Sequence, residues 1–308
     1  MKRIKIALVG LGKIARDQHI PALADGDAFE LTGVASPHHK WNGLPNYDDL
    51  PALIRAQPEV TAVALCTPPQ VRYDIARTAL EHGLHVLLEK PPGVSVSEVV
   101  ALADLAARQR VALFASWHAR HARGVEPARE WLRERSIRSV RIAWKEDVRI
   151  WHPGQAWIWK AGGLGVFDPG INALSILTRI LPGPVALKSA DLRYPENCAT
   201  PIAAHLSMSG DNGMTAIAEF DFLQTGPQTW TIDVETDSGW LTLSMGGKEL
   251  YIDGREVGTP ATAEYPSLYA HFGELVRRRR SDVDIAPLQL VADAFLCGRR
   301  IEVDSFVE

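Results

Sequence analysis

The stretch IKIALVGLGKIA at residues 4–15 decides the fold of this chain. Residues 4–9 have the composition of a short buried β-strand, and the pattern G-x-G-x-x-A follows them at once. In this pattern Gly10 permits a tight turn, Gly12 lets the backbone approach a pyrophosphate, and Ala15 is small enough for a helix to pack on the sheet. The free N–H groups at the start of that helix attract phosphates. The stretch therefore predicts a βαβ unit that binds a dinucleotide.

The residues that follow continue the alternation of strands and helices. A helical pattern covers residues 70–82, and a second begins at Ser95, which has capping-box spacing to Glu98. Four further strand-like runs are apolar throughout, at residues 31–35, 60–66, 85–88 and 111–115. Such strands are typical of a parallel sheet that is covered by helices on both faces. We therefore expect a doubly wound α/β Rossmann domain over residues 1–120.

The pattern changes after about residue 118. A helical linker is predicted at residues 123–135 and a long, partly alternating strand at 138–150. Several strand-like runs with hairpin-type turns lie between about 186 and 253, and helical stretches close the chain at 264–280 and 286–298. We expect residues 121–308 to form an α+β domain on a large, mainly antiparallel open sheet. Its C-terminal helix could pack back on the Rossmann domain.

Composition narrows the possible partners and location. The chain has 308 residues, 46% of them hydrophobic, and a net charge of -4, which gives no reason to expect nucleic acid or an anionic membrane as the main partner. No apolar stretch is long enough to cross a bilayer, and the first residues lack a signal-peptide core. The three cysteines lie far apart and form neither a disulfide framework nor a zinc pattern. We expect a cytoplasmic protein without a metal site.

The end of the second strand bears on the choice of cofactor. Sites that prefer NAD usually place Asp or Glu there to accept the ribose hydroxyls, but residues 35–40 read ASPHHK. Ser36 can bond a 2′-phosphate, and His38 and the basic residues beside it can help to neutralise its charge. This predicts the use of NADP with some tolerance of NAD. The alternative is that residues 38–40 form only a solvated loop.

Several motifs together resemble a known family. The glycine loop is followed by Thr67-Pro68-Pro69, by Glu89-Lys90-Pro91 and by GGLGVFDPGIN at residues 162–172, in that order. Over nearly the full length this resembles the glucose–fructose oxidoreductase, inositol dehydrogenase and rhizopine catabolism family of sugar dehydrogenases. Many members have His where this chain has Asn172, and Asn at this position resembles the aldose 1-dehydrogenases of the family. The resemblance implies cofactor binding by Gly10, Gly12, Lys13, Ile14, Ser36, His38, Thr67, Pro68, Glu89 and Lys90.

The resemblance also implies a reaction, the oxidation of the anomeric carbon of a free sugar of the L-arabinose, D-galactose or D-fucose type to the aldonolactone. Lys90 follows the fourth strand, at the edge where open α/β sheets bind ligands, and would stabilise the reacting oxygen; the alternative is a surface salt bridge with Glu89. Asp168 and Asn172 share one face if a helix runs from Asp168 to Ile180. Asp168 would be the base or only a helix cap, and Asn172 would orient the hydroxyl.

Further residues are candidates for the sugar, because sugars suit aromatic planes combined with short polar groups. By resemblance they are His118, Glu146, Trp151, His152 and Trp230, beside Asp168 and Asn172. Each has a structural alternative, since a Trp in a sheet is usually core and a lone His usually makes ordinary hydrogen bonds.

Competing functions remain open at this point. They are another sugar or inositol dehydrogenase, a glycosidase that recycles bound NAD, and a cofactor sensor without catalysis. The presence of both Lys90 and Asp168 disfavours the sensor. If the outer face of the second sheet is apolar it must be covered, and relatives cover it by pairing two subunits. We therefore expect a homodimer or a higher homo-oligomer.

Overall fold

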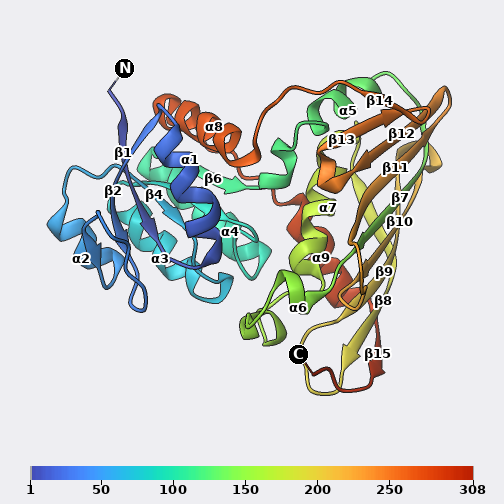
Figure 1. Cartoon of the computed structure of the whole chain (residues 1–308), viewed down its shortest axis with the longest axis horizontal. Helices are drawn as coiled ribbons and strands as arrows, with labels where there is room; N and C mark the ends of the chain where they lie inside the picture. Colours follow the sequence, from blue (N-terminus) through green and yellow to red (C-terminus); the bar gives the residue numbers. More distant parts are fainter. Residues whose placement is uncertain (1, 308) are drawn as a thin grey trace. The chain divides into compact units, whose positions relative to one another are not determined.

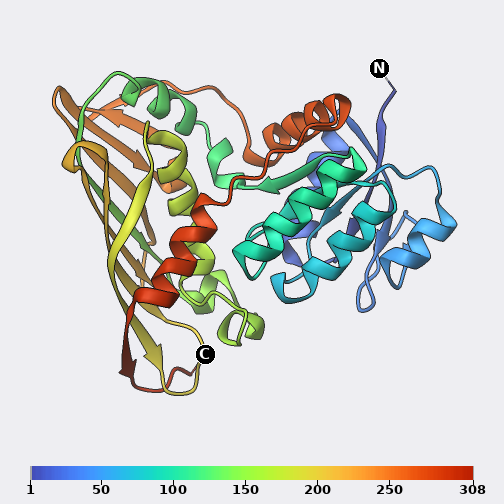
Figure 2. The ribbon, with the colours of Figure 1, turned by 180° about the vertical axis from the view of Figure 1, so that it is seen from behind.

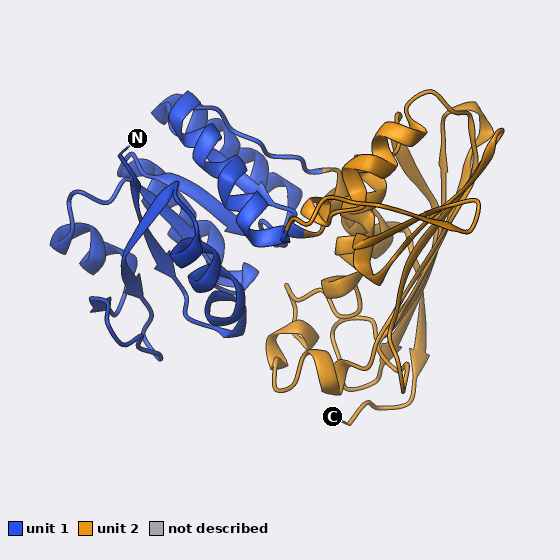
Figure 3. Ribbon diagram, turned by 45° about the horizontal axis from the view of Figure 1, so that its top comes forward, with its two compact units in different colours: residues 1–118, 263–285 blue, residues 119–262, 286–308 orange. Residues whose placement is uncertain are grey.

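The computed structural model describes residues 2–307, which form two compact units. The first unit combines the chain up to His118 with Ala263–Ile285, and the second combines Ala119–Thr262 with the chain from Ala286 onward (Figure 3). The expected division at residue 120 placed residues 263–285 in the second domain. The structure instead returns this segment to the first unit, while the last helix stays in the second.

The first unit contains a parallel six-stranded sheet in the order β3-β2-β1-β4-β5-β6 (Figure 1). Its strands are β1 Ile4–Val9, β2 Phe29–Ala35, β3 Asn46–Tyr47, β4 Ala62–Leu65, β5 His85–Glu89 and β6 Leu113–Ser116. Strand order reverses between β1 and β4, and ligands of such sheets bind outside the carboxyl ends of the strands at this switch point. The predicted doubly wound fold is confirmed.

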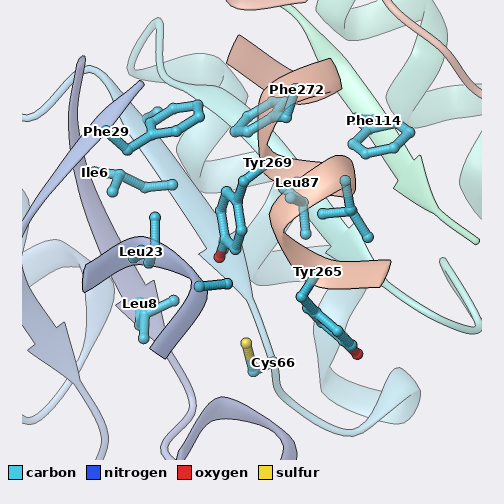
Figure 4. Packing of buried hydrophobic residues seen from close by; sticks show 14 of the residues in the cluster. Ile6, Leu8, Leu23, Phe29, Cys66, Leu87, Phe114, Tyr265, Tyr269 and Phe272 are labelled. Carbon is cyan, nitrogen blue, oxygen red and sulfur yellow. The ribbon is translucent and has the colours of Figure 1, made fainter. Parts of the chain in front are cut away.

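Helices cover both faces of this sheet. They are α1 Ile20–Asp25, α2 Leu50–Ala56, α3 Pro69–Glu81, α4 Val96–Gln109 and α8 Glu264–Arg278. Alternate strand residues feed two separate cores, one shared with α2, α3 and α4 and the other with α1 and α8. Figure 4 shows the second core, where Phe272 of α8 stacks on Phe29 with ring centroids 5.4 Å apart. Ser95 caps α4 as predicted, since its Oγ accepts a hydrogen bond from the Glu98 N–H at 3.3 Å, but the Glu98 carboxylate accepts the Val94 N–H and not that of Ser95, so the capping box is only half formed.

The second unit contains a nine-stranded sheet in the order β14-β13-β12-β11-β7-β10-β9-β8-β15. Its strands are β7 Ile137–Lys145, β8 Val185–Pro195, β9 Ala203–Gly210, β10 Thr215–Asp221, β11 Thr229–Thr236, β12 Gly239–Ser244, β13 Glu249–Ile252, β14 Arg255–Val257 and β15 Arg299–Val303. All neighbouring strands are antiparallel except the pairs β7–β10 and β8–β15. This confirms the predicted, mainly antiparallel sheet.

Helices cover one face of the second sheet (Figures 1 and 2). They are α5 Val125–Leu132, α7 Phe167–Ile180 and α9 Ala286–Cys297. The short helices of the described chain as a whole are α6 Val148–Trp151, η1 Ala15–His19, η2 His118–His121, η3 Ala156–Trp159, η4 Asp211–Gly213 and η5 Met245–Gly247. The strand predicted to reach residue 150 ends at Lys145, because Asp147 caps α6 through the Arg149 N–H. The predicted linker helix is α5, which packs on α7 within the unit.

The outer face of this sheet is mostly polar. Along β7 and β10 the buried residues alternate with outward-facing ones such as Arg141, Lys145 and Glu219, and His205 of β9 is also exposed. Lys145 and Glu219 form an ion pair at 2.5 Å across the two strands. Along these three strands the outer face therefore does not meet the condition, an apolar surface, under which subunit pairing was expected.

Candidate functional site

The glycine loop at the end of β1 has room for a phosphate on one side only. Gly10 has φ +89°, and a Cβ there would lie 2.9 Å from the backbone of Cys66 and Thr67. A Cβ built on Gly12 would meet nothing within 4 Å, so the backbone is open on that side. The buried Oγ1 of Thr67, at the end of β4, makes no hydrogen bond within the described chain. A closed turn, an open backbone and an unpaired hydroxyl at the switch point fit a dinucleotide.

The other residues implied for the cofactor lie on the same loops. Ser36 is buried directly after β2, and its N–H donates to the Tyr47 carbonyl at 2.8 Å, while His38 is exposed. Lys13 is exposed and forms an ion pair with Asp17 one turn further on. Ile14, also implied for the cofactor, packs against the core beside α1. Pro68 is exposed and directly precedes α3.

Glu89 ends β5 as a buried group with only 3% of its surface exposed. Its Oε1 accepts hydrogen bonds from His19 Nε2 at 2.9 Å and from the Tyr265 hydroxyl at 2.8 Å, and its Oε2 accepts the Lys90 N–H at 2.8 Å. The other ring nitrogen of His19 bonds the Tyr269 hydroxyl at 2.7 Å. Glu89 is therefore part of an interior network beneath Lys90, and not the surface carboxylate that the alternative reading assumed.

The segment from Glu89 to Pro91 is also held from a second side. The peptide bond between Lys90 and Pro91 is cis. The buried guanidinium of Arg72 donates hydrogen bonds to the carbonyls of Glu89, Pro91 and Thr67, so one side chain ties the β4 and β5 loops together. These contacts fix the backbone at Lys90.

The pKa values of the buried pair His19 and Glu89 are both shifted toward the charged form. Burial by itself lowers the pKa of His19, but electrostatic interactions with Cys66 and Tyr269 and hydrogen bonds to Cys66 and Glu89 raise this pKa well above 6.5. Burial by itself raises the pKa of Glu89, but the hydrogen bond and charge of His19, with help from His118 and Tyr265, lower it to about 2. Both shifts favour an ion pair under the loop that carries Lys90.

In the second unit, the glycine-rich motif positions Asp168. A Cβ on Gly163 would overlap the Trp157 carbonyl, and a Cβ on Gly165 would overlap that of Pro201. Helix α7 then begins at Phe167 with Val166 as its N-cap residue. Asp168 is therefore the second residue of the helix, 3% exposed, and not its cap. Asn172 lies one turn further on, as predicted, and its buried Oδ1 finds no partner among the described residues.

The structure brings Asp168 together with four of the residues expected at the sugar. His152 directs Nδ1 toward Asp168 Oδ2 at 3.5 Å and Nε2 toward Glu146 Oε1 at 2.8 Å. The indole N–H of Trp230 donates to Glu146 Oε2 at 2.8 Å. Trp151 packs edge-on against Trp230 at 4.8 Å between ring centroids and is 41% exposed. The result is a row of carboxylate, imidazole and carboxylate beside two indoles.

His118 has a different setting. It belongs to the first unit, where Nδ1 bonds Glu264 Oε2 at 2.8 Å and the ring stacks on Tyr265. Its sequence neighbour Trp117 is buried and donates its indole N–H to the Asp284 carbonyl. The structure thus supplies a local partner for His118.

Four functional candidates were not predicted, namely His19, Arg72, Tyr265 and Tyr269. Each is a polar side chain on a helix, and only its burial against a segment distant in sequence reveals its role. Within residues 2–307, no group of three His, Cys, Asp or Glu side chains could hold a metal ion, and no helix is long and apolar enough to cross a membrane.

Comparison with known proteins gives three main results. Residues 4–116 match the profile of an oxidoreductase family with an NAD-binding Rossmann fold. The chain is 45% identical to a galactose 1-dehydrogenase of Pseudomonas fluorescens over 308 residues, which covers 100% of both chains. The crystal structure of a D-galactose-1-dehydrogenase protein from Rhizobium etli superposes with a TM-score of 0.95 at 51% identity, covering 100% of this chain and 99% of that one.

A more distant structure shares the fold alone. A 3-ketoreductase from Actinomadura kijaniata, solved with NADP and TDP-benzene, has a TM-score of 0.85 at 19% identity and covers 98% of this chain and 100% of its own.

Proposed function

This chain belongs to the Gfo/Idh/MocA family of oxidoreductases, and from this premise we propose that it is an NAD(P)-dependent aldose 1-dehydrogenase acting on a sugar of the galactose type. The observation that carries the proposal is the buried row of Glu146, His152 and Asp168 beside Trp230. It combines a base with the aromatic and polar groups that a sugar requires. The full-length similarity to two galactose 1-dehydrogenases supports the same substrate class.

The residues have distinct parts in this reaction. Asp168 removes the proton of the C1 hydroxyl, and the unpaired amide oxygen of Asn172 orients the sugar by a hydrogen bond. The ammonium of Lys90 stabilises negative charge on the C1 oxygen. A nicotinamide dinucleotide held by the glycine loop at Gly10 and Gly12 would supply the hydride acceptor for C1, so that the sugar would leave as the aldonolactone. No metal is required, because the ring oxygen already stabilises charge at C1.

Sugar recognition is proposed for the aromatic and polar side chains around this row. Trp151 and Trp230 offer apolar ring surface to the C–H face of the sugar, and Trp151 is exposed enough to do so. Glu146, His152 and His118 offer hydrogen bonds to hydroxyl groups.

We propose NADP as the cofactor, with NAD also accepted, because no carboxylate follows β2. We also propose that the protein works in the cytoplasm as a homodimer or a larger homo-oligomer. Light scattering at micromolar concentration tests the last point, and a monomer would contradict it.

The function is tested with a panel of free aldoses, each assayed with NADP and with NAD. The absorbance of the reduced nicotinamide reports turnover. We expect strong turnover with D-galactose or a close stereochemical relative. Asp168→Asn should lower kcat by about 10²–10⁴-fold while the cofactor still binds. A glycosidase that recycles its cofactor would instead release sugar from a glycoside without net reduced cofactor, and an inositol dehydrogenase would oxidise inositols and not aldoses. Near-normal turnover by the Asn variant would refute the base role.

A further inference from the structure

The row Glu146–His152–Asp168 has an order that restricts the protonation of its imidazole. Glu146 lies directly after β7 and is 2% exposed, and its two oxygens meet two different groups. Oε2 accepts the indole N–H of Trp230, which can only donate, and Oε1 lies 2.8 Å from Nε2 of His152. Because an ionised carboxylate only accepts hydrogen bonds, Nε2 must carry a hydrogen. In neutral His152, Nδ1 is therefore the nitrogen with the free lone pair.

That lone pair faces Asp168. Nδ1 lies 3.5 Å from Asp168 Oδ2, which is longer than a good hydrogen bond. A contact of this length can tighten to a hydrogen bond in a catalytic complex. The ring is also packed against Phe222 and retains 14% exposure, so one side of it can exchange a proton with water. Asp168 and Glu146 are the charged groups that the structure places against this ring.

We propose that His152 accepts the substrate proton from Asp168, and that Glu146 is the positioning residue that makes it able to do so; this rests on the aldose dehydrogenase activity proposed above. The O–H bond of the C1 hydroxyl breaks, and its proton passes to Asp168 and then to Nδ1 of His152. Glu146 stabilises the imidazolium, which releases the proton to water. The two electrons of the C1–H bond leave as the hydride already assigned to NAD(P)⁺. The sugar is thereby oxidised, and its electrons and its proton are both accounted for.

Asn172 lies on α7, and its buried amide oxygen has no hydrogen-bond partner among the described residues, so this oxygen is left for the sugar.

Glu146→Gln is the sharpest variant, because Trp230 fixes how the new amide must lie. The indole N–H requires the amide oxygen, so the amide NH₂ group faces Nε2 of His152. Nε2 must then accept, the hydrogen moves to Nδ1, and the ring can no longer take a proton from Asp168. The side chain keeps its size, so a loss of turnover would arise from the tautomer. His152→Ala is the second variant, because it leaves space for added imidazole.

The first measurement does not depend on activity. Ring ¹⁵N chemical shifts of histidine-labelled protein report the tautomer, and the His152 signals are assigned by their absence from the Ala variant. We expect a hydrogen on Nε2 in the wild type and on Nδ1 in Glu146→Gln. A hydrogen on Nδ1 in the wild type would overturn the proposal.

The second measurement is kinetic, with His205→Ala, on the outer face of the sheet, as the matched control. We expect both site variants to lose about 10²-fold in kcat with a smaller change in KM, and added imidazole to restore kcat only in His152→Ala. Their kcat should also rise with pH, as hydroxide replaces the lost acceptor. A raised KM with unchanged kcat and no rescue would make His152 a sugar ligand and overturn the relay. A wild type that oxidises no aldose would overturn the proposed function itself, whereas an active wild type with insensitive variants overturns the relay alone.

Discussion

Ser36 occupies the position that we propose to govern the choice of cofactor. It follows β2 directly, at the carboxyl edge of the sheet, where ribose hydroxyls bind in related sheets. Ser36→Asp would place a carboxylate against the 2′-phosphate of NADP, where like charges repel. We expect kcat/KM with NADP to fall by about 10²-fold and the value with NAD to change little or to rise. Steady-state kinetics with both cofactors measure this; equal losses with the two would show that Ser36 does not contact the ribose.

Glu89 and His19 make stability depend on pH in a defined window. The pKa of Glu89 is lowered from 4.5 to about 2, so its contribution is present above pH 4.5 and is lost as pH falls toward 2. The pKa of His19 is raised above 6.5, so its contribution is complete below 6.5 and is lost as pH rises through the higher folded value. The pair therefore stabilises the fold most between pH 4.5 and 6.5.

The variant Glu89→Gln tests this window. Removing one partner of a buried ion pair costs about 3–5 kcal/mol, because the other charge stays buried. We expect the difference in the free energy of unfolding from the wild type to be largest between pH 4.5 and 6.5 and to narrow on either side. Urea unfolding at several pH values measures it. The control is Glu81→Gln, which removes an exposed pair with Arg77 and should change stability little at any pH.

At the scale of elements, the start of α7 is set by close backbone packing. The loop before it runs between the carbonyls of Trp157 and Ile158 on one side and, on the other, the Pro201 carbonyl and the Thr200 side chain. Within it the Val166 N–H donates to the Pro201 carbonyl at 2.8 Å. The glycines of this motif are therefore required by space, and the helix that carries Asp168 is placed by them.

Comparing Gly165→Ala with Gly213→Ala separates two costs in the free energy of unfolding, the steric overlap of the added Cβ and the strain of a positive φ. Both glycines have positive φ, +54° and +77°, but a Cβ on Gly165 would overlap Pro201 whereas one on Gly213 would meet nothing within 4 Å. We expect Gly213→Ala to cost about 1–2 kcal/mol from conformation alone. Gly165→Ala should cost more and should also lower kcat, because Asp168 shifts. Urea unfolding and steady-state kinetics measure both; equal costs would show that the loop can move aside.

Elements whose residue pattern is continuous in sequence could be predicted. Elements that depend on packing against a segment distant in sequence could not. Strand β1 and the cap of α4 follow from residues adjacent in sequence. By contrast, the helix after the glycine loop contains a π-helical segment, Ala15–His19, which turns His19 toward Glu89. Nothing in the local pattern reports such a turn. In the same way β15 pairs in parallel with β8, which lies about a hundred residues earlier, and it was not predicted.

The residues of the candidate site differ in the same way in how far the sequence predicts them. Asp168 and Lys90 could be proposed because their motifs are continuous in sequence. Glu146, His152 and Trp230 could be named as candidates, but the order of their hydrogen bonds required the structure. The tautomer argument depends on that order.

For the molecule as a whole, the return of residues 263–285 to the first unit has a consequence for folding. Helix α8 supplies Tyr265, Tyr269 and Phe272 to the core that contains Phe29 (Figure 4). The segment after it continues along β6, where the Ala115 N–H donates to the Asp282 carbonyl at 3.0 Å. A fragment that ends at residue 118 would lose these contacts and leave the carboxylate of Glu89 without the Tyr265 hydroxyl.

We therefore expect residues 1–118 alone to lack cooperative unfolding and cofactor binding. A chain that joins residue 118 to residues 263–285 through a short glycine linker should fold and bind NADP. Such a linker can close because His118 Nδ1 lies 2.8 Å from Glu264 Oε2, so the two ends are adjacent within the unit. Near-ultraviolet circular dichroism and calorimetric titration with NADP compare the two chains. Cooperative folding of the shorter fragment would mean that α8 is an accessory to the Rossmann core, whereas failure of the joined chain would show that the first unit needs the second in order to fold.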